Sequence, residues 1–216
     1  MRHDLFPDEG STKIEIFDEI NELCSHDYQY AEGKILNSIC TSPVDIAKES
    51  YLNFIETNLG DTRLFPGVAM IEEKTIKMLG SLVGNPDCYG TIISGGTEAN
   101  LLALYVAREL FYKRKSKNIV PEIIAPKSAH FSIEKVCKIL NLKPVFIPLF
   151  DIQHAGAAEI EAAINENTAA IIATAGTSEL GAVDNIPDIS RIANKYKIYF
   201  HVDAASGGFL IPLPEN

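Results

Sequence analysis

Four short segments of this sequence carry residues that could hold a phosphate group or an aromatic ring. "SGGT" contains Gly96 and Thr97, "SAHFS" contains His130, "AGTSELG" contains Thr177, and "HVDAASGG" contains Asp203. Paired glycines leave a tight turn without side chains, and the free N–H groups at the start of a helix attract anions. The first segment therefore predicts a phosphate site at Gly96 and Thr97.

The glycine segment differs from the two familiar nucleotide-binding loops. Its pattern is neither GxxxxGK[ST] nor GxGxxG, which argues against a nucleoside triphosphatase and against a dinucleotide-binding fold. A simpler interpretation stays open, in which the glycines only turn the chain and Thr97 only caps a helix. Taken singly, His130 could be an imidazole beside a helix, and Asp203 could be a carboxylate that caps a turn.

The elements that would position these residues alternate between short apolar strands and amphipathic helices. The sequence predicts strands at 89–93, 123–125, 145–148, 170–174 and 198–202. It predicts helices between them at 98–113, 132–140, 158–165 and 188–196. A repeated strand–helix unit of this kind is typical of an α/β fold, with a mainly parallel sheet covered by helices on both faces.

Each of the chemistry-bearing segments directly follows a predicted strand. In open α/β sheets, ligands bind beyond the carboxyl ends of the strands, so these segments are expected on one edge. A flat aromatic cofactor with one phosphate needs a phosphate cradle, a planar side chain to stack on its ring, and a carboxylate that keeps a ring nitrogen protonated. Gly96 with Thr97, His130 and Asp203 could supply these three parts together.

The first part of the chain has a different, helical pattern. Thr12 and Glu15 have the spacing of a capping box at a helix start. Apolar residues then recur at helical spacing in two stripes, the first made of Ile16, Ile20 and Leu23 and the second of Val68, Ile71, Met78, Leu79 and Leu82. We therefore predict an N-terminal helical segment at 1–84 and the α/β cofactor-binding domain at 85–216.

Composition excludes several classes of partner. The 216 residues include 19 basic and 29 acidic side chains, a net charge of −10, with no basic patch suited to nucleic acid. The four cysteines lack CxxC spacing and the five histidines lack HExxH spacing, so no metal site is expected. The start of the chain has no apolar signal core, and no apolar run approaches the roughly 18 residues of a membrane span. We expect a cytoplasmic protein.

Taken together, the motifs resemble a known enzyme family. "SGGTEANLLAL", "SAHFSIEK", "AGTSELGAVDNI" and "HVDAASGGFLIP" are similar to those of the group II decarboxylases that use pyridoxal 5′-phosphate (PLP). The similarity is greatest to archaeal L-tyrosine/L-aspartate decarboxylases, and it extends from the N-terminal helix through "ETNLGDTRLFPG" to the end of the chain. It implies fold type I, a homodimer with the active site at its interface, and decarboxylation of L-aspartate to β-alanine and/or of L-tyrosine to tyramine.

The resemblance also implies roles for individual residues. Gly96 and Thr97 would bind the phosphate, and Thr177 would touch the cofactor ring or its substituents. His130, which would stack on the ring, and Asp203, which would pair with the pyridine nitrogen, are the expected catalytic residues. Ala205 would pack beneath the ring. Residues of the N-terminal segment would approach the amino-acid substrate, which makes Ser38 and Asp61 the candidates there.

One feature departs from the family pattern. The family's Schiff-base lysine lies in a His-Lys pair downstream of the aspartate motif, and no lysine follows Lys197 in this sequence. We therefore expect an incomplete enzyme, without the remaining strands of the large domain or the C-terminal small domain. Three alternatives stay open, namely a glutamate decarboxylase, a C–C lyase similar to sphingosine-phosphate lyase, and an inactive half-domain that binds a phosphate-bearing ligand.

Overall fold

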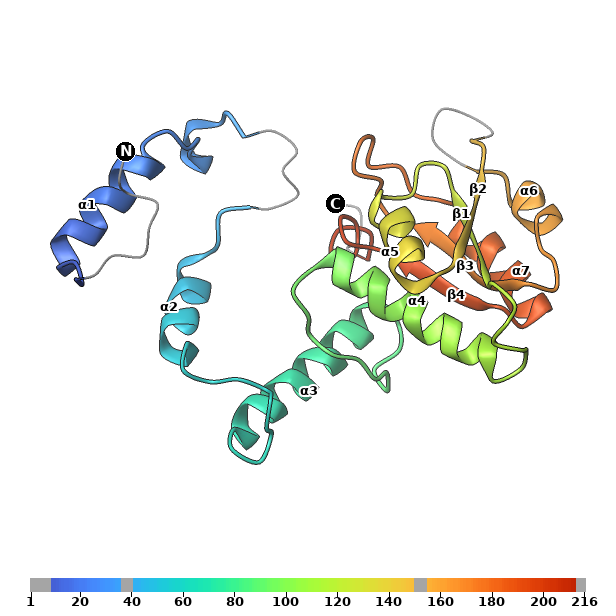
Figure 1. The fold of residues 1–216 in the computed structure, drawn as a ribbon, viewed down its shortest axis with the longest axis horizontal. Helices are drawn as coiled ribbons and strands as arrows, with labels where there is room; N and C mark the ends of the chain where they lie inside the picture. The colour runs from blue at the N-terminus through green and yellow to red at the C-terminus, as the bar shows by residue number, and fades with distance from the viewer. Residues whose placement is uncertain (1–8, 36–40, 150–154, 213–216) are drawn as a thin grey trace. The chain divides into compact units, whose positions relative to one another are not determined.

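The structure, a computed structural model, describes residues 9–35, 41–149 and 155–212 of the chain. The chain forms two compact units, Met1–Asn53 and Phe54–Asn216, and Figure 1 shows the helices and strands of each. No helix in these described ranges is both long enough and apolar enough to cross a membrane.

The first unit contains helices without a buried core. Helix α1 (Lys13–Cys24) begins with the predicted capping box, in which the Glu15 N–H donates to Thr12 Oγ1 at 3.3 Å and the Thr12 N–H donates to Glu15 Oε2 at 2.7 Å. A short 3-10 turn, η1 (Tyr30–Glu32), and helix α2 (Asp45–Phe54) follow. None of the described residues of α1 or α2 is buried, so both helices present their apolar side chains on the surface of the structure.

The second unit begins with helix α3 (Pro66–Leu82), and an extended segment leads from it to helix α4 (Gly96–Tyr112). The predicted strand at 89–93 is wrong, because these residues pair with no strand in the described part of the chain. Instead, the Ile92 N–H and the Thr91 hydroxyl donate to Glu72 Oε1 on α3, at 2.7 and 2.9 Å. An apolar run becomes a strand only beside a partner strand, and here a helix side chain takes that place.

The four remaining predicted strands form one parallel sheet. They are β1 (Glu122–Pro126), β2 (Lys143–Ile147), β3 (Thr168–Thr174) and β4 (Tyr199–Asp203), in the order β2-β1-β3-β4. Every neighbouring pair is parallel, and the last residues of β3 and β4, Thr174 and Asp203, lie opposite each other. Consequently all four strands end at the same edge, as the predicted α/β fold requires.

Helices cover both faces of this sheet (Figure 1), with α4 and α5 (Ser132–Leu140) on one face and α6 (Ala157–Ala162) and α7 (Ile186–Tyr196) on the other. Successive strand residues face opposite sides, so Ile172 packs with α4 and α5 whereas Ile171 packs with α6 and α7. The two resulting cores are both built mainly from buried aliphatic side chains.

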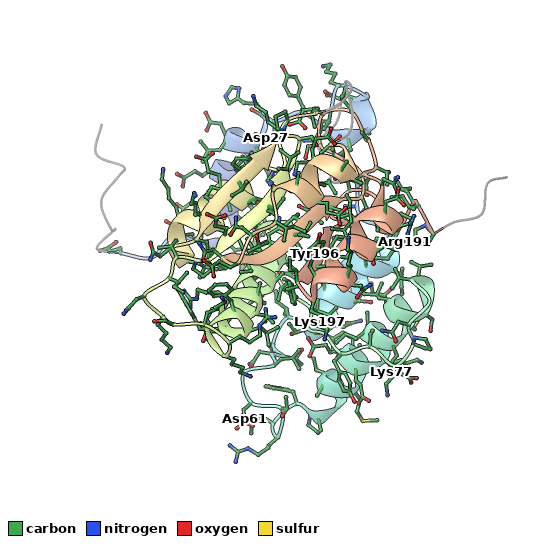
Figure 2. The ribbon with its side chains drawn as sticks, turned by 90° about the vertical axis from the view of Figure 1, so that its right-hand side faces the viewer. Asp27, Asp61, Lys77, Arg191, Tyr196 and Lys197 are labelled. Atoms are coloured by element: carbon green, nitrogen blue, oxygen red, sulfur yellow. The ribbon has the colours of Figure 1, made fainter. Side chains whose placement is uncertain are left out.

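Helix α7 shows how these covering helices end. Lys197, the residue after α7, has a φ of 55° in the left-handed region, and its N–H donates to the Asn194 carbonyl at 3.2 Å. Figure 2 labels Arg191 and Tyr196 of α7, together with Lys197 directly after the helix. The Tyr196 hydroxyl donates to Glu161 Oε1 on α6 at 3.0 Å, which joins the two helices of this face.

Candidate cofactor site at the carboxyl edge of the sheet

The structure brings the predicted site residues to the edge where the four strands end. Asp203 is the last residue of β4, His130 lies in the turn between β1 and α5, and Thr177 lies in the turn after β3. Helix α4 begins at Gly96 and packs against β3 and β4. A Cβ atom added to Gly96 would lie 3.0 Å from Ala205 Cβ, so the start of α4 directly meets the turn after β4.

Asp203 is a buried carboxylate with part of its acceptor capacity in use. It is 8% exposed. Its Oδ2 accepts from Asn100 Nδ2 at 2.9 Å, and its Oδ1 accepts from the Ala205 N–H at 3.1 Å. Since an ionised carboxylate has about four acceptor positions, Asp203 can accept another N–H without losing either bond.

A buried amide, Asn100 on α4, connects Asp203 to the loop that carries His130. Its Nδ2 also donates to Ser132 Oγ at 2.9 Å, and Ser132 Oγ lies 2.9 Å from His130 Nδ1. His201 Nε2, on β4, lies 2.7 Å from Asn100 Oδ1. A continuous set of hydrogen bonds therefore runs from the carboxylate at the end of β4 to the imidazole after β1.

The sequence analysis did not identify Asn100, Ser132 or His201. For Asn100 a signal existed, because it occupies the same helical stripe as three buried residues of α4, Leu104, Ala107 and Phe111. A polar residue within an apolar stripe needs a hydrogen-bond partner when it is buried. For His201 the signal was weaker, namely that it precedes Asp203 by two residues and so shares a face of β4 with it.

His201 sits in an environment that favours its uncharged form. Burial lowers the pKa of His201 below its ordinary value, and the Asp203 carboxylate partly opposes this shift. A neutral imidazole carries one N–H, and the Asn100 Oδ1 atom opposite Nε2 can only accept. His201 therefore carries its proton on Nε2 and donates it to Asn100.

The imidazole of His130 is held from one side by its own turn. Its Nδ1 accepts the Ser132 N–H at 3.2 Å and faces Ser132 Oγ. The ring lies 4.1 Å from the Phe131 ring, centre to centre, with the two planes tilted by 41°. His130 is partly exposed whereas Ser132 is fully buried. Ser132 therefore holds the His130 ring from the buried side and leaves part of it accessible to a ligand.

The turn after β3 packs tightly against the turn after β4. Gly176 has a φ of 96°, a left-handed conformation that favours glycine, and the Gly207 N–H donates to the Ala175 carbonyl at 2.9 Å. A Cβ atom on Gly207 would lie 2.3 Å from that carbonyl oxygen. Thr177 is 5% exposed, and its Oγ1 accepts the Ala182 N–H at 3.1 Å. These glycines let Thr177 and Asp203 approach the same edge.

The start of α4 can accept an anion. No hydrogen bond among the described residues uses the N–H groups of Gly96 and Thr97, as expected for the first turn of a helix. The carboxylate of Glu98 does not occupy them, because its Oε2 instead accepts from the Ser94 hydroxyl and N–H at 2.6 and 2.8 Å. These bonds, the hydroxyl first, lower the pKa of Glu98.

A buried hydroxyl beside Asp203 adds to the case for a polar ligand. Thr174 lies opposite Asp203 in the sheet register, and its Oγ1 is buried with no hydrogen-bond partner among the residues that the structure describes. Buried hydroxyls normally have a partner. Together with the free N–H groups of α4, the partly exposed His130 ring and the spare acceptor positions of Asp203, this edge fits a flat, phosphate-bearing cofactor.

Of the two substrate candidates, Ser38 lies outside the described residues, and Asp61 has no hydrogen bond to the described residues of this sheet edge. Asp61 lies in the turn before α3 (Figure 2), where its Oδ2 accepts from Arg63 Nη2 at 2.8 Å and its Oδ1 from Arg63 Nε at 3.0 Å. The Arg63 guanidinium lowers the pKa of Asp61. Because no hydrogen bond among the described residues joins Asp61 to the sheet edge, its substrate role stays a prediction.

Comparison with known proteins shows which family the chain belongs to. Residues 10–215 match the family model of the pyridoxal-dependent decarboxylase conserved domain. A probable L-tyrosine/L-aspartate decarboxylase of Methanosphaera stadtmanae is 45% identical over 205 residues, which are 95% of this chain and 52% of that protein. The L-aspartate/L-glutamate decarboxylase of Pyrococcus horikoshii is 44% identical over 98% of this chain and 54% of its own length. The chain thus spans about half the length of the curated relatives it matches.

Solved structures show the same fold at lower identity. Glutamate decarboxylase of Lactobacillus brevis has a TM-score of 0.84 at 22% identity, over 98% of this chain and 52% of that chain. Mouse CSAD in the apo form has a TM-score of 0.84 at 22% identity, over 95% of this chain and 47% of its own. These similarities confirm the predicted fold type I α/β architecture. With a family match across nearly its whole length, the chain belongs to the pyridoxal-dependent decarboxylase family, whose cofactor is PLP.

Proposed function

We propose that this chain carries the PLP site of a carboxy-lyase that converts L-aspartate to β-alanine and/or L-tyrosine to tyramine. The observation that carries the proposal is Asp203, a buried carboxylate with spare acceptor positions that is joined through Asn100 and Ser132 to His130. The substrates are those named for the M. stadtmanae relative. L-glutamate is the alternative substrate, since the P. horikoshii relative is named for L-aspartate and L-glutamate.

In this proposal each residue at the sheet edge has one task. The N–H groups of Gly96 and Thr97 bind the phosphate, since a helix start favours negative charge. His130 stacks on the ring, Ala205 packs beneath it, and the Thr177 hydroxyl contacts the ring or its substituents. Asp203 accepts a hydrogen bond from the protonated ring nitrogen.

The type of each residue suits the chemistry. When bound, PLP supplies a conjugated ring that takes up the electron pair left at Cα as CO2 departs. Asp203 favours this by keeping a proton on the ring nitrogen, because a carboxylate within hydrogen-bond distance stabilises the charged form of a base. An asparagine at this position would offer no such charge. His130 would fix the orientation of the ring when the cofactor is bound.

Further parts of the proposal concern the whole protein. We propose a homodimer, in which a second copy covers apolar side chains such as Ile14 and Leu23 on α1, which are 73% and 65% exposed. We also propose a cytoplasmic location, which the free thiols of Cys24, Cys88 and Cys137 support. Residues 1–84 would form the helical segment and residues 85–216 the PLP-binding large domain.

The test compares Asp203→Asn with the unaltered full-length gene product. PLP binding is followed by fluorescence titration, and CO2 release is measured with L-aspartate, L-tyrosine and L-glutamate. We expect Asp203→Asn to keep most of its PLP affinity but to lose several orders of magnitude in CO2 release. Asp188→Asn is the matched control, since Asp188 lies in the first turn of α7, on the face of the sheet opposite to α4, and bonds to Asn185.

Three outcomes separate the alternatives. Near-normal CO2 release by Asp203→Asn would refute the role of the carboxylate. PLP binding without CO2 release from any of the three amino acids would favour the inactive phosphate-ligand-binding domain. Cleavage of a phosphorylated amino alcohol without CO2 release would favour the C–C lyase.

A further inference from the structure

We propose that Asn100 is a positioning residue, which holds Asp203 in place and, through Ser132, fixes the His130 imidazole in one tautomer before the cofactor binds. The significance of Asp203 and His130 rests on the proposed function. The hydrogen bonds that carry the inference belong to this chain alone.

The amide of Asn100 can adopt only one orientation. It is 1% exposed, and its neighbours are a carboxylate, a hydroxyl and an imidazole. Asp203 Oδ2 can only accept, so the atom of Asn100 that lies 2.9 Å from it must be the NH2 nitrogen. Its two hydrogens then go to Asp203 and Ser132, and its oxygen accepts from His201. Every polar atom of Asn100 is used.

This orientation determines where the proton of His130 lies. Ser132 Oγ already accepts from Asn100 Nδ2, so its own hydrogen is free to donate to His130 Nδ1, 2.9 Å away. The Ser132 N–H points at the same nitrogen from 3.2 Å. With two donors directed at it, Nδ1 cannot carry a proton. His130 therefore has its proton on Nε2.

As a consequence, one residue positions two side chains that lie at the ends of different strands. Asn100 lies in the first turns of α4, Asp203 ends β4, and His130 follows β1. One buried amide thus fixes both the carboxylate that would face the ring nitrogen and the imidazole that would lie on the ring. Preorganised side chains of this kind bind a rigid ligand more tightly, because they lose little freedom on binding.

Two substitutions separate positioning from simple packing. Asn100→Asp keeps the shape of the side chain but replaces the NH2 group with a second acceptor 2.9 Å from Asp203. Ser132→Ala leaves the Asn100–Asp203 bond intact and removes the hydroxyl link to His130, so that the backbone N–H of residue 132 is left as the one donor to Nδ1. If Asn100 merely fills space, His130 should keep the same tautomer in Asn100→Asp as in the unaltered protein, whatever the substitution does to stability. If Asn100 positions Asp203 and His130, His130 should populate both neutral tautomers in each of the two variants.

The decisive measurement is long-range ¹H–¹⁵N NMR of the full-length protein, labelled with ¹⁵N-histidine and free of PLP. The His130 resonances are assigned with His130→Gln. We expect a single Nε2–H tautomer in the unaltered protein and a mixture of tautomers in Asn100→Asp and in Ser132→Ala. The dissociation constant for PLP should rise about tenfold or more in Asn100→Asp, which corresponds to ~1.4 kcal/mol.

Asn165→Ala supplies the matched control. Asn165 Nδ2 donates to Glu122 Oε2 at 2.7 Å, and Glu122 begins β1 at the opposite edge of the sheet. This variant also loses an amide–carboxylate hydrogen bond, so it should be less stable to urea. Its His130 tautomer and its PLP affinity should not change.

The results distinguish this inference from the proposed function. If the unaltered protein releases no CO2 but its His130 tautomer depends on Asn100, the positioning role stands and the proposed function fails. If CO2 is released but His130 keeps its Nε2–H tautomer in both Asn100→Asp and Ser132→Ala, the positioning role is overturned and the proposed function survives. Ser132→Ala keeps the test valid if Asn100→Asp does not fold.

Discussion

Replacement of Gly96 by alanine should weaken PLP binding, because the first residue of α4 has no room for a methyl group. The new Cβ would lie 3.0 Å from Ala205 Cβ. Carbon atoms in contact prefer about 3.5–4.0 Å, so this contact is tight and one of the two must give by a few tenths of an ångström. Either the start of α4 or the turn after β4 must move, and these are the places where the phosphate and the ring would lie.

Two opposing effects set the size of the change. Overpacking of a tight contact costs about 1–3 kcal/mol. Alanine is a better helix former than glycine by at most about 1 kcal/mol, and the gain is smaller in the first turn. The overpacking cost therefore dominates. If about 1–2 kcal/mol of this overpacking cost appears only when PLP is bound, the dissociation constant for PLP rises by about 5- to 30-fold.

Gly67→Ala is the matched control for this substitution. Gly67 is the second residue of α3, and a Cβ atom there would meet nothing within 4 Å. This variant should gain up to about 1 kcal/mol in unfolding free energy and leave PLP binding unchanged. Urea denaturation and fluorescence titration with PLP measure the two quantities.

A second substitution tests the cause. Ala205→Gly removes the opposing methyl group, so the double variant should recover part of the affinity that Gly96→Ala loses. The single Ala205→Gly variant completes a double-mutant cycle. The cycle measures the coupling energy between the two substitutions in PLP binding. The reasoning fails if Gly96→Ala binds PLP as tightly as the unaltered protein, or if the two substitutions act additively.

Two further predictions follow from buried titratable groups. Burial lowers the pKa of His201, so the unfolded chain takes up a proton on this imidazole at a higher pH than the folded chain does. The free energy of unfolding should therefore fall as the pH drops from about 6.5 through the lower pKa that His201 has in the folded protein. His201→Gln keeps an N–H for Asn100 but does not titrate, so in this variant the free energy of unfolding, measured by urea denaturation at several pH values, should change less over this range. The same pH dependence in the variant and in the unaltered protein would contradict the prediction. Burial raises the pKa of Cys137 to about 12, so the native protein should label at exposed Cys24 but not at Cys137 with a thiol reagent at about pH 8, as read by peptide mass spectrometry. Rapid labelling of native Cys137 would contradict this.

Local patterns in the sequence predicted most of the second unit. Helix α5 has the predicted bounds, Ser132–Leu140, because its apolar residues recur at helical spacing and its face is buried. The strands β1 and β3 were predicted because short apolar runs in a parallel sheet are buried on both faces, as these are. The segment 89–93 has the same apolar character but no partner strand in the described residues. Strand formation depends on a neighbour, which a local pattern does not reveal.

The site was predictable in part for a topological reason. Parallel strands all end at one edge, so residues after β1, β3 and β4 had to meet there. The hydrogen bonds between them were not predictable in the same way. Asn100 and Asp203 are separated by 103 positions, and their contact depends on how α4 crosses the end of β4. That crossing is set by packing of Leu104 and Phe111 against the sheet, which the sequence shows only as an apolar stripe.

The position of Asn100 bears on how this edge would hold the proposed cofactor at two separate points. A cofactor gripped by its phosphate and by a ring nitrogen requires a fixed distance between the two grips. In the proposed site the phosphate would be held at Gly96, where α4 begins, and the amide that bonds to Asp203 comes four residues later, about 6 Å along the same helix. A helix changes length far less than a loop does, so the spacing is set by helix geometry and one buried side chain. The carboxylate can then keep its place while the turn after β4 adjusts to the ring.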